Sequence, residues 1–373
     1  MCSEFACSDR PKIMLVTNQL QDSPSGGREL LCKLNYQALR EIFCDRLVLF
    51  ELPLSRINSI QSIIGAFQGN IDGLNDELIN RAIQVIETEK VSKVFVDGSN
   101  LGEIVRVLKQ RLPSVEVSTF FHNVESRFFL GAFRHAWTFR AMAVLIVNYM
   151  AEKKSVRFSD KVICLSERDS YLIQRLYGRA ATHISPMALQ DKLQADCRLV
   201  RNTQHEKYML FVGGVFYANR VGIDWFIKHV VQHIEIKVYI VGRGFEDLKA
   251  TLDLPGKVEV VGSVDSLSDW YLDSHFVIAP IFDGSGMKTK VAEALMYGKK
   301  VIGTPEAFSG YEVVTQSVGW KCVTADEFVS AIECAQSLPL KSFDPELRAL
   351  YEDKYSFAAA RERLSLILMD ESL

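Results

Sequence analysis

KIMLVTNQLQDSPSGGRELLCKLNYQALREIF, residues 12–43, is the stretch of sequence that decides the fold. It opens with a short apolar run at residues 12–17 and continues through a loop of Ser, Pro and Gly. The following segment then has the 3.6-residue spacing of an amphipathic helix, through Leu30, Leu31, Leu34, Ala38 and Ile42. This order of buried strand, loop and helix recurs along the rest of the chain.

Ten further runs are short and apolar, as buried strands are, and lie at residues 47–52, 93–96, 115–121, 161–165, 208–212, 237–241, 257–261, 276–279, 300–302 and 320–323. Helix-like sequence separates them, which is typical of parallel sheets covered on both faces. A mixed polar stretch at 182–206 interrupts the alternation and is interpreted as a linker. We therefore predict an α/β protein with two Rossmann-like lobes, 1–190 and 205–345, facing each other across a cleft.

Composition narrows the functional class. A chain of 373 residues with a formal net charge of −3 suits two domains and argues against a general nucleic-acid binder. The eight cysteines form no C-x-x-C pair, so a structural zinc site is not expected and buried free thiols are. The first residues resemble no secretion signal, and Arg134, His135 and Arg140 interrupt the one long apolar stretch at 128–150. A cytoplasmic protein without a spanning helix is the expectation.

Polar residues follow two of the predicted strands in the first lobe. Gly26 and Gly27 open a helix, where free backbone N–H groups favour a phosphate, although a flexible turn explains the glycines equally well. His122 and Glu125 lie directly after the strand at 115–121. The histidine can bond a sugar hydroxyl or act as an acid or base, and the alternative is a structural loop histidine.

One glycine motif of the chain begins like a nucleotide-binding fingerprint, and a second known fingerprint is absent from the sequence. Gly242, Arg243 and Gly244 begin a dinucleotide motif, but Asp247 stands where its third glycine belongs, so a nicotinamide or flavin site is rejected. The tight turn remains suitable for a nucleobase to rest against. No G-x-x-x-x-G-K-[ST] occurs in the sequence, so an NTPase is not expected.

The richest loop follows the strand at 276–279. It contains Gly284, Ser285, Gly286 and Met287, and a helix is predicted to begin near Met287. Lys288 and Lys290 add positive charge to the anion-binding N–H groups of that helix start, and Glu293, about two turns on, can accept bonds from ribose hydroxyls. A solvated helix start capped by Ser285 explains the glycines and the serine but not the lysines and Glu293 together. We predict a nucleoside diphosphate site.

The segment 284–302 resembles the donor-site signature of the GT-B retaining glycosyltransferases, in particular family 4 (group 1). Glu293 matches the second of two family glutamates, which binds the ribose, while Ser285 stands where the first belongs. Gly26-Gly27 is similar to the family's N-terminal glycine loop, and His122 to a histidine that lies near the transferred sugar. Arg220 matches a basic residue aimed at the diphosphate. The last helix, 355–373, resembles the one that crosses back to the first lobe.

The resemblance implies transfer of a sugar from a nucleoside diphosphate sugar to an acceptor hydroxyl with retention, in glycan or glycoconjugate biosynthesis. The expected catalytic residues are His122 and Glu125. The expected donor-binding residues are Gly26, Gly27, Arg220, Gly242, Arg243, Gly284, Ser285, Gly286, Met287, Lys288, Lys290 and Glu293. Neither a metal nor another cofactor is expected, because the lysines and the helix start would neutralise the leaving diphosphate. A silent nucleotide-sugar-binding partner and a nucleotide-sugar 2-epimerase remain as alternatives.

The expected acceptor, which is a glycan, a lipid-linked sugar or a small molecule, would bind the first lobe. Residues 127–157 are its least typical part, because basic residues alternate there with Phe128, Phe129, Phe133, Trp137 and Phe139. One interpretation is a peripheral contact with the inner face of the membrane. The other is one long helix with its aromatic side chains in the core and its charges in water. No nucleic-acid partner is expected.

Overall fold

A computed structural model describes residues 10–18, 20–21, 27–53, 60–193, 207–284, 286–339 and 343–370. The chain forms two compact units, each with its own internal contacts. Unit 1 comprises Met1–Met187 and Phe357–Leu373, and unit 2 comprises Ala188–Ser356. The C-terminal helix therefore belongs to the same unit as the N-terminal half of the chain. Two predicted site residues, Gly26 and Ser285, lie outside the described residues.

Unit 1 is built on a parallel sheet in the order β2-β1-β3-β4-β5-β6. Its strands are β1 (Ile13–Asn18), β2 (Leu47–Leu52), β3 (Lys93–Asp97), β4 (Glu116–Phe120), β5 (Lys161–Cys164) and β6 (His183–Ile184). Strand β6 lies inside the stretch predicted to be a linker, so that prediction was wrong at its start. Two edge residues paired to β5 are too short a run to leave a periodic signal.

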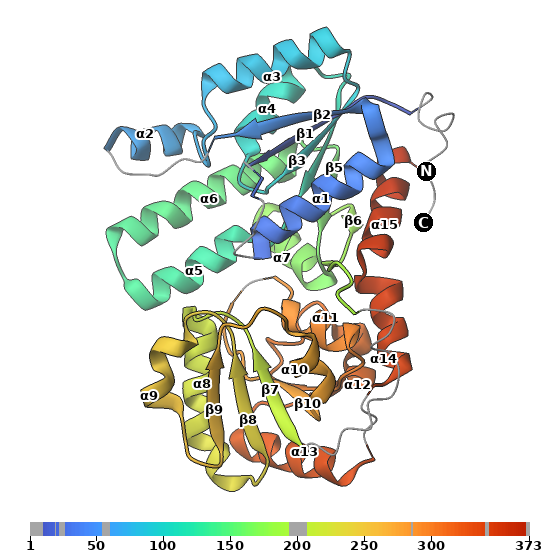
Figure 1. The fold of residues 1–373 in the computed structure, drawn as a ribbon. Helices are drawn as coiled ribbons and strands as arrows, with labels where there is room; N and C mark the ends of the chain where they lie inside the picture. The colour runs from blue at the N-terminus through green and yellow to red at the C-terminus, as the bar shows by residue number, and fades with distance from the viewer. Residues whose placement is uncertain are drawn as a thin grey trace. The chain divides into compact units, whose positions relative to one another are not determined.

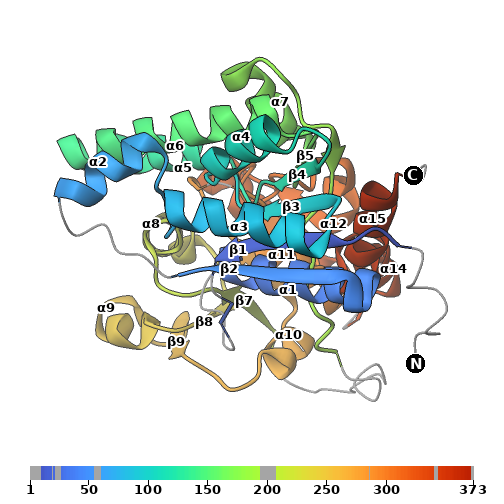
Figure 2. The same cartoon turned by 90° about the horizontal axis from the view of Figure 1, so that it is seen from above.

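Helices cover both faces of the first sheet (Figure 1). They are α1 (Gly27–Phe43), α2 (Ile60–Gln68), α3 (Asp76–Glu89), α4 (Gly102–Arg111), α5 (Glu125–Ala136), α6 (Phe139–Phe158), α7 (Glu167–Tyr177) and α15 (Phe357–Met369). Side chains of α3 and α4 pack on one face through a core that includes Met14 and Val16. Helix α15 packs against α1. Figure 2 shows α2 beside α6, where Ala66 contacts Val147 and Ala151.

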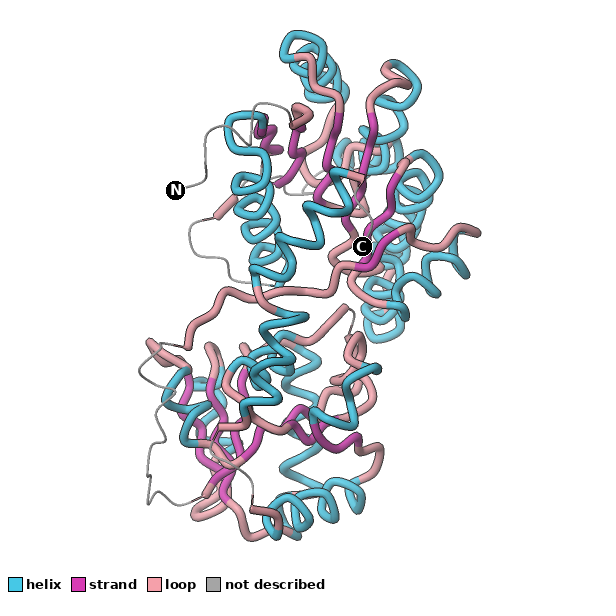
Figure 3. The backbone as a smooth tube through the Cα atoms, turned by 90° about the vertical axis from the view of Figure 1, so that its right-hand side faces the viewer, coloured by secondary structure: helices cyan, strands magenta, loops and turns pink. Residues whose placement is uncertain are grey.

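Unit 2 repeats the architecture with the strand order β12-β11-β10-β7-β8-β9, again all parallel. The strands are β7 (Tyr208–Val212), β8 (Lys237–Val241), β9 (Val258–Gly262), β10 (Phe276–Ala279), β11 (Val301–Gly303) and β12 (Gly319–Lys321). The helices are α8 (Tyr217–His229), α9 (Lys249–Leu252), α10 (Ser268–Asp273), α11 (Thr289–Met296), α12 (Thr315–Val318), α13 (Ala325–Ser337) and α14 (Pro345–Leu350). In each unit the strands run side by side between helices (Figure 3). The prediction of two Rossmann-like parallel sheets is confirmed.

Each sheet has a point at which consecutive strands are added in opposite directions. In unit 2 this switch point lies between β7 and β10, and in unit 1 it lies between β1 and β3. Loops that leave neighbouring strands there diverge to opposite faces, and ligands of open α/β sheets bind in the crevice so formed. The loops after β7, β10, β1 and β3 are therefore the places to look for a site.

Candidate functional site

The loops after β7 and β8 lie backbone against backbone at the carboxyl edge of the second sheet. Gly213 and Gly242 both have positive φ, 152° and 154°. A Cβ atom on Gly242 would lie 1.9 Å from the carbonyl oxygen of Gly213, so no larger residue fits without moving the loop. The N–H of Val215 also donates to the carbonyl of Arg243 over 2.9 Å. Gly242, in the turn predicted to contact a nucleobase, is therefore needed for the close approach of the two loop backbones.

Lys290, in the first turn of α11, is buried against the loop that follows β7. Its side chain is only 6 % exposed, its Nζ donates to Oδ1 of Asn219 over 2.7 Å, and it lies 4.4 Å from the centre of the Phe211 ring. Asn219 in turn donates to the carbonyl of Gly214. Burial lowers the pKa of Lys290 to about 7, outweighing the opposite effect of the Glu293 carboxylate. The lysine thus bridges the two sides of the switch point, and its amine gives up its proton more readily than that of an exposed lysine.

Glu293 is held in position by a buried tyrosine. The hydroxyl of Tyr271 donates to Oε2 of Glu293 over 2.8 Å, and the Tyr271 ring stacks on Tyr297 at 4.8 Å with 10° between the planes. Burial and the Glu293 charge raise the pKa of Tyr271 well above its usual range, so the phenol keeps its proton and stays a donor. Glu293 itself is partly exposed.

Lys288 precedes the helix rather than forming part of it. Its extended backbone places the start of α11 at Thr289, so the prediction of a helix beginning near Met287 was wrong by two residues. Its Nζ donates to the carbonyl of Gly286 over 2.8 Å and pairs with Glu306 at 3.0 Å. The charge that the sequence offers to an anion is therefore already balanced by a carboxylate from the loop after β11.

The other predicted donor-binding residues lie around the same edge. Met287 is buried, with its side chain packed close to Gly310. Gly284 lies beside the Lys288 side chain, and Gly286 has the positive φ of 65° that favours glycine. Arg243 is exposed at the turn after β8. Arg220 is also exposed, and its Nε lies 3.6 Å from Oδ2 of Asp224 on its own helix.

The switch point of the first sheet contains a network around a buried carboxylate, that of Asp97 at the end of β3. Asp97 is 0 % exposed. Its Oδ1 accepts hydrogen bonds from Nε2 of His122 over 2.7 Å and from Nδ2 of Asn35 over 2.8 Å, and its Oδ2 accepts one from the Thr17 hydroxyl over 3.1 Å. Burial raises the pKa of Asp97, but the His122 imidazole and these donors outweigh it and lower the pKa below its usual value.

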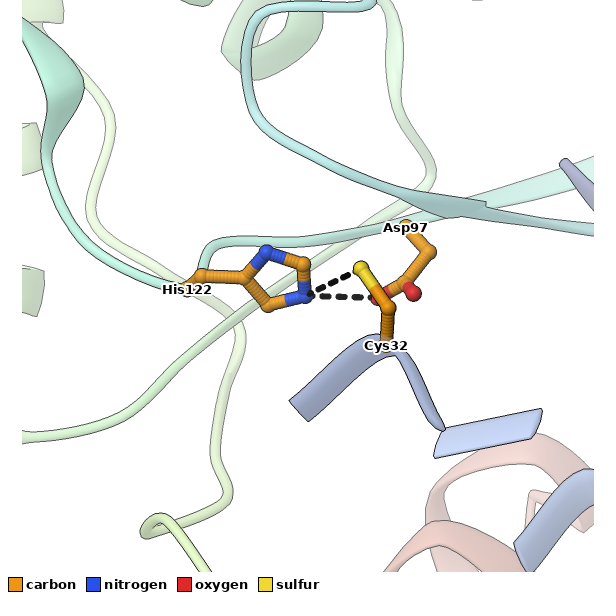
Figure 4. A group of neighbouring side chains, drawn as sticks. All are labelled: Cys32, Asp97 and His122. Atoms are coloured by element: carbon orange, nitrogen blue, oxygen red, sulfur yellow. Dashed lines mark hydrogen bonds and ion pairs between the residues drawn. The ribbon is translucent and has the colours of Figure 1, made fainter. Parts of the chain in front are cut away.

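Cys32, on α1, completes this network (Figure 4). Its Sγ lies 3.9 Å from Nε2 of His122, and burial together with the Asp97 charge raises the pKa of the thiol above its usual range. Cys32, Asp97 and His122 are three residues of the kinds that bind metals, with ligand atoms all within 4.8 Å of one another. Sequence reasoning singled out His122 alone, because its partners come from α1 and β3, far away in the chain.

Gly27 and its neighbour Arg28 begin α1 close to this network. A Cβ atom on Gly27 would meet no atom of the described residues within 4 Å, so packing against them does not require glycine there. Arg28 donates to Asn18, Asp72 and Asn100, over 2.9, 2.6 and 3.3 Å. These contacts fix the first turn of the helix at the edge of the sheet and leave open space over Gly27.

Glu125 is a buried carboxyl group at the first position of α5. Burial raises its pKa to about 7; Arg28 opposes the shift, whereas Glu152 and Asp72 add to it. A second glutamate, Glu152 of α6, accepts hydrogen bonds from the N–H groups of Glu125 and Ser126, both over 2.9 Å. Glu152 therefore caps α5, which frees the Glu125 side chain from that task and leaves it able to exchange a proton near neutral pH.

Residues 127–157 form two helices, α5 and α6, instead of the single long helix considered above. The chain turns at Trp137, which has a positive φ of 42°, and Thr138 caps the second helix by accepting from the N–H of Ala141. Trp137 and Phe139 are 77 % and 83 % exposed, so these two aromatic side chains are not part of the core. None of the helices in the described part of the chain is long and apolar enough to span a membrane.

A known protein family matches part of unit 2. Residues 206–336, which hold all of β7 to β12, match the family described as Glycosyl transferases group 1. Among curated protein sequences, none matches the chain significantly.

Solved structures resemble the chain over nearly its whole length. Sucrose-phosphate synthase from Thermosynechococcus elongatus aligns with a TM-score of 0.70 at 15 % identity, covering 97 % of this chain and 99 % of the other. The chain has the GT-B fold. HepE from Anabaena in complex with UDP aligns with a TM-score of 0.65 at 13 % identity, covering 96 % and 100 %. The lipopolysaccharide outer core galactosyltransferase WaaB aligns at 0.61 and 12 % identity, covering 96 % and 99 %.

Proposed function

We propose that this GT-B protein is a glycosyltransferase that moves a sugar from a nucleoside diphosphate sugar to an acceptor hydroxyl. The observation that carries the proposal is a pair of side-chain contacts made by α11 in unit 2: the buried one of Lys290 with Asn219 and the partly buried one of Glu293 with Tyr271. They lie within the region that matches the group 1 glycosyltransferases, and HepE, of the same fold, has been solved with UDP and with UDP-glucose. Lys290 and Glu293 lie about one helical turn apart on α11, so the amine can bind a diphosphate while the carboxylate binds the adjoining ribose.

In this proposal different residues of unit 2 bind the diphosphate, the ribose and the base of the donor. Lys290, Lys288 and the N–H groups at the start of α11 stabilise the negative charge that builds up on the departing diphosphate, without a metal ion. The partly exposed Glu293 accepts hydrogen bonds from the ribose hydroxyls. The close-packed turns at Gly213 and Gly242 offer a backbone surface to the base. Lys288 has to exchange part of its contact with Glu306 for the ligand, so that ion pair sets a cost on binding.

The residues of unit 1 are assigned to the sugar. With Nε2–H of His122 donating to Asp97, its Nδ1 is the nitrogen free to accept a bond from a sugar hydroxyl. Glu125, with its pKa of about 7, exchanges a proton with the acceptor side. Retention at the anomeric carbon, and a role in glycan or glycoconjugate synthesis in the cytoplasm, complete the proposal and rest on the family resemblance.

The experiment combines binding with turnover on purified protein. Calorimetry with UDP, GDP, ADP and dTDP identifies the base, and the corresponding nucleotide sugars are then assayed for transfer and for slow hydrolysis. Glu293→Ala is expected to weaken diphosphate binding, whereas His122→Ala is expected to lower turnover and leave the affinity for the diphosphate nearly unchanged. Binding without turnover on any donor would contradict the enzyme assignment, and unchanged affinity in Glu293→Ala would contradict the site.

We also propose that the protein contacts a membrane surface through the turn between α5 and α6, which would bring it to a lipid-linked acceptor. Two exposed aromatic side chains, Trp137 and Phe139, stand there between the exposed Arg134 and Arg140, the combination that binds anionic bilayer surfaces. Liposomes containing phosphatidylglycerol should co-sediment with the protein, and the Trp137→Ala/Phe139→Ala variant should remain in the supernatant. Tyr171→Ala, which removes an exposed aromatic residue of α7, is the matched control. Equal sedimentation of the two variants would refute this contact.

A further inference from the structure

The cluster of Cys32, Asp97 and His122 has a property that the transfer reaction does not need. The three side chains come from α1, the end of β3 and the loop after β4, so secondary structure in three parts of the chain holds them together (Figure 4). They offer one sulfur, one carboxylate oxygen and one imidazole nitrogen, the ligand types that zinc prefers. All three are buried, at 5 %, 0 % and 5 % exposure.

The ligand atoms lie close enough together for one ion to reach them after small movements of the side chains. Zinc lies about 2.0–2.2 Å from nitrogen and oxygen ligands and about 2.3 Å from sulfur. Nε2 of His122 and Oδ1 of Asp97 are 2.7 Å apart, and Nε2 and Sγ of Cys32 are 3.9 Å apart. At a tetrahedral angle these bonds place nitrogen and oxygen ligands about 3.4 Å apart and nitrogen and sulfur ligands about 3.6 Å apart. His122 and Asp97 therefore have to separate by about 0.7 Å, and His122 and Cys32 have to approach by about 0.3 Å, for one ion to bind. One ion can therefore reach Nε2 together with either partner while the backbone stays in place.

The net charge of the three ligands and the hydrogen bonds to Asp97 are also consistent with a bound divalent cation. A doubly charged cation with one thiolate, one carboxylate and a neutral imidazole is neutral overall, which greatly lowers the cost of burying the Asp97 charge. Asn35 and Thr17 donate to the Asp97 carboxylate and orient it, as the outer partners of metal ligands commonly do. A water molecule would complete a four-coordinate site.

We propose that Cys32, Asp97 and His122 bind one zinc-like divalent cation. On binding, the thiol proton of Cys32 passes to solvent, and the proton on Nε2 of His122 is replaced by one on Nδ1, because the metal takes the Nε2 lone pair. The ion and the Nε2–H···Asp97 bond therefore exclude each other. The site is separate from the one proposed for the diphosphate but shares His122 with the proposed sugar site, and Nδ1 of His122 can accept from a sugar hydroxyl only in the ion-free form. Metal binding is measured directly, so the inference does not depend on transferase activity.

Cobalt(II) tests the proposal, because a cobalt–thiolate bond gives a charge-transfer band in the near ultraviolet. Untagged protein, freed of metal by a chelator and a desalting step, is titrated with cobalt chloride. The expected result is one equivalent bound with the thiolate band, and loss of the band when one equivalent of zinc is added. Absence of a stoichiometric thiolate band would overturn the proposal.

Variants assign the band to this cluster. Cys32→Ser is nearly isosteric and should lose the band and weaken cobalt binding at least about tenfold, and Asp97→Asn should weaken binding by a similar factor. Cys334→Ser, which replaces an exposed cysteine on α13, is the matched control and should keep both band and affinity. Circular dichroism verifies that each variant is folded. Full binding by Cys32→Ser, or loss of the band in Cys334→Ser, would refute the site.

Discussion

Nζ of Lys290 donates a 2.7 Å hydrogen bond to Oδ1 of Asn219 across the point where the second sheet reverses its strand order. The lysine is buried, yet neither contact that the structure gives its amine, to an amide oxygen and to the face of Phe211, carries a full negative charge. An anionic ligand at this edge would provide the missing counter-charge. The contact thus holds an amine at this edge whose pKa is lowered to about 7 by burial, and which a bound diphosphate would stabilise in its charged form.

The first prediction is proton uptake on donor binding. Because the pKa of Lys290 is about 7 without ligand, most copies are neutral at pH 8, and a bound diphosphate should raise that pKa. Calorimetry of UDP binding at pH 8 should therefore give heats that differ between phosphate and Tris buffers by a fraction of a proton. Affinity should fall as the pH rises above 7. Lys290→Met should bind more weakly, with the same heat in both buffers.

The same shift has a consequence for stability with a definite sign. The folded-state pKa of Lys290 lies below its unfolded value of 10.5, so the unfolded chain binds more protons between pH 7 and 10.5. The contribution of Lys290 to the free energy of unfolding should therefore rise with pH across that window. Urea melts of the wild type and Lys290→Met at pH 6.5 and 9 measure it. A difference between the two proteins that does not change with pH would contradict the buried, neutral lysine.

A third prediction concerns Tyr271, which orients Glu293. Tyr271→Phe removes one hydrogen bond to a carboxylate, so UDP affinity should drop roughly three- to thirtyfold, equivalent to about 0.7–2 kcal/mol. In a Glu293→Ala background the same change should have almost no effect on affinity. Tyr208→Phe removes a buried hydroxyl bonded to the Trp270 carbonyl at the other end of β7 and serves as the control. Additive losses in the double variant would show that the two residues act separately.

The sequence predicted the framework well because periodicity is a local property. Most strands are short runs dominated by apolar residues, and the predicted bounds of β2, β7, β8 and β10 agree with the structure. Strand β6 was missed, since two residues carry no period. The turn at Trp137 was missed for a related reason: a left-handed tryptophan between two helices has no signal comparable to that of glycine or proline.

The site was predicted only where a motif is contiguous. Lys288, Lys290 and Glu293 were predicted together because they lie in one short segment. The residues that pair with them were not predicted. Glu306, Asn219 and Tyr271 come from other loops and helices, and only the fold brings them into contact. Asp97 was not predicted, although it is an acidic residue at the end of an apolar strand. The position of His122 directly after a strand was the reason for selecting that residue.

A fourth prediction treats Asp97 as a positioning residue for His122. Asp97→Asn keeps the shape of the side chain but removes the charge that fixes the imidazole, so kcat should fall about ten- to a hundredfold while KM changes little. The pH profile of kcat should also shift, which a purely structural defect would not cause. Thr17→Val removes the donor to the other carboxylate oxygen and should have a smaller effect. A parallel rise in KM with an unchanged kcat would contradict this role.

The last prediction separates folding from ligand contact at Gly27. A methyl group there meets open space, and alanine is a better helix former than glycine by up to about 1 kcal/mol, so Gly27→Ala should fold at least as stably as the wild type. If the donor lies against the start of α1, the same methyl group should lower its affinity or turnover at least about fivefold, because the ligand occupies that space. Gly178→Ala is the contrasting control. Its position is equally open, but the left-handed φ of 84° at the end of α7 should cost stability and leave activity intact. Unchanged kinetics in Gly27→Ala would mean that the glycine loop is a turn and not part of the donor site.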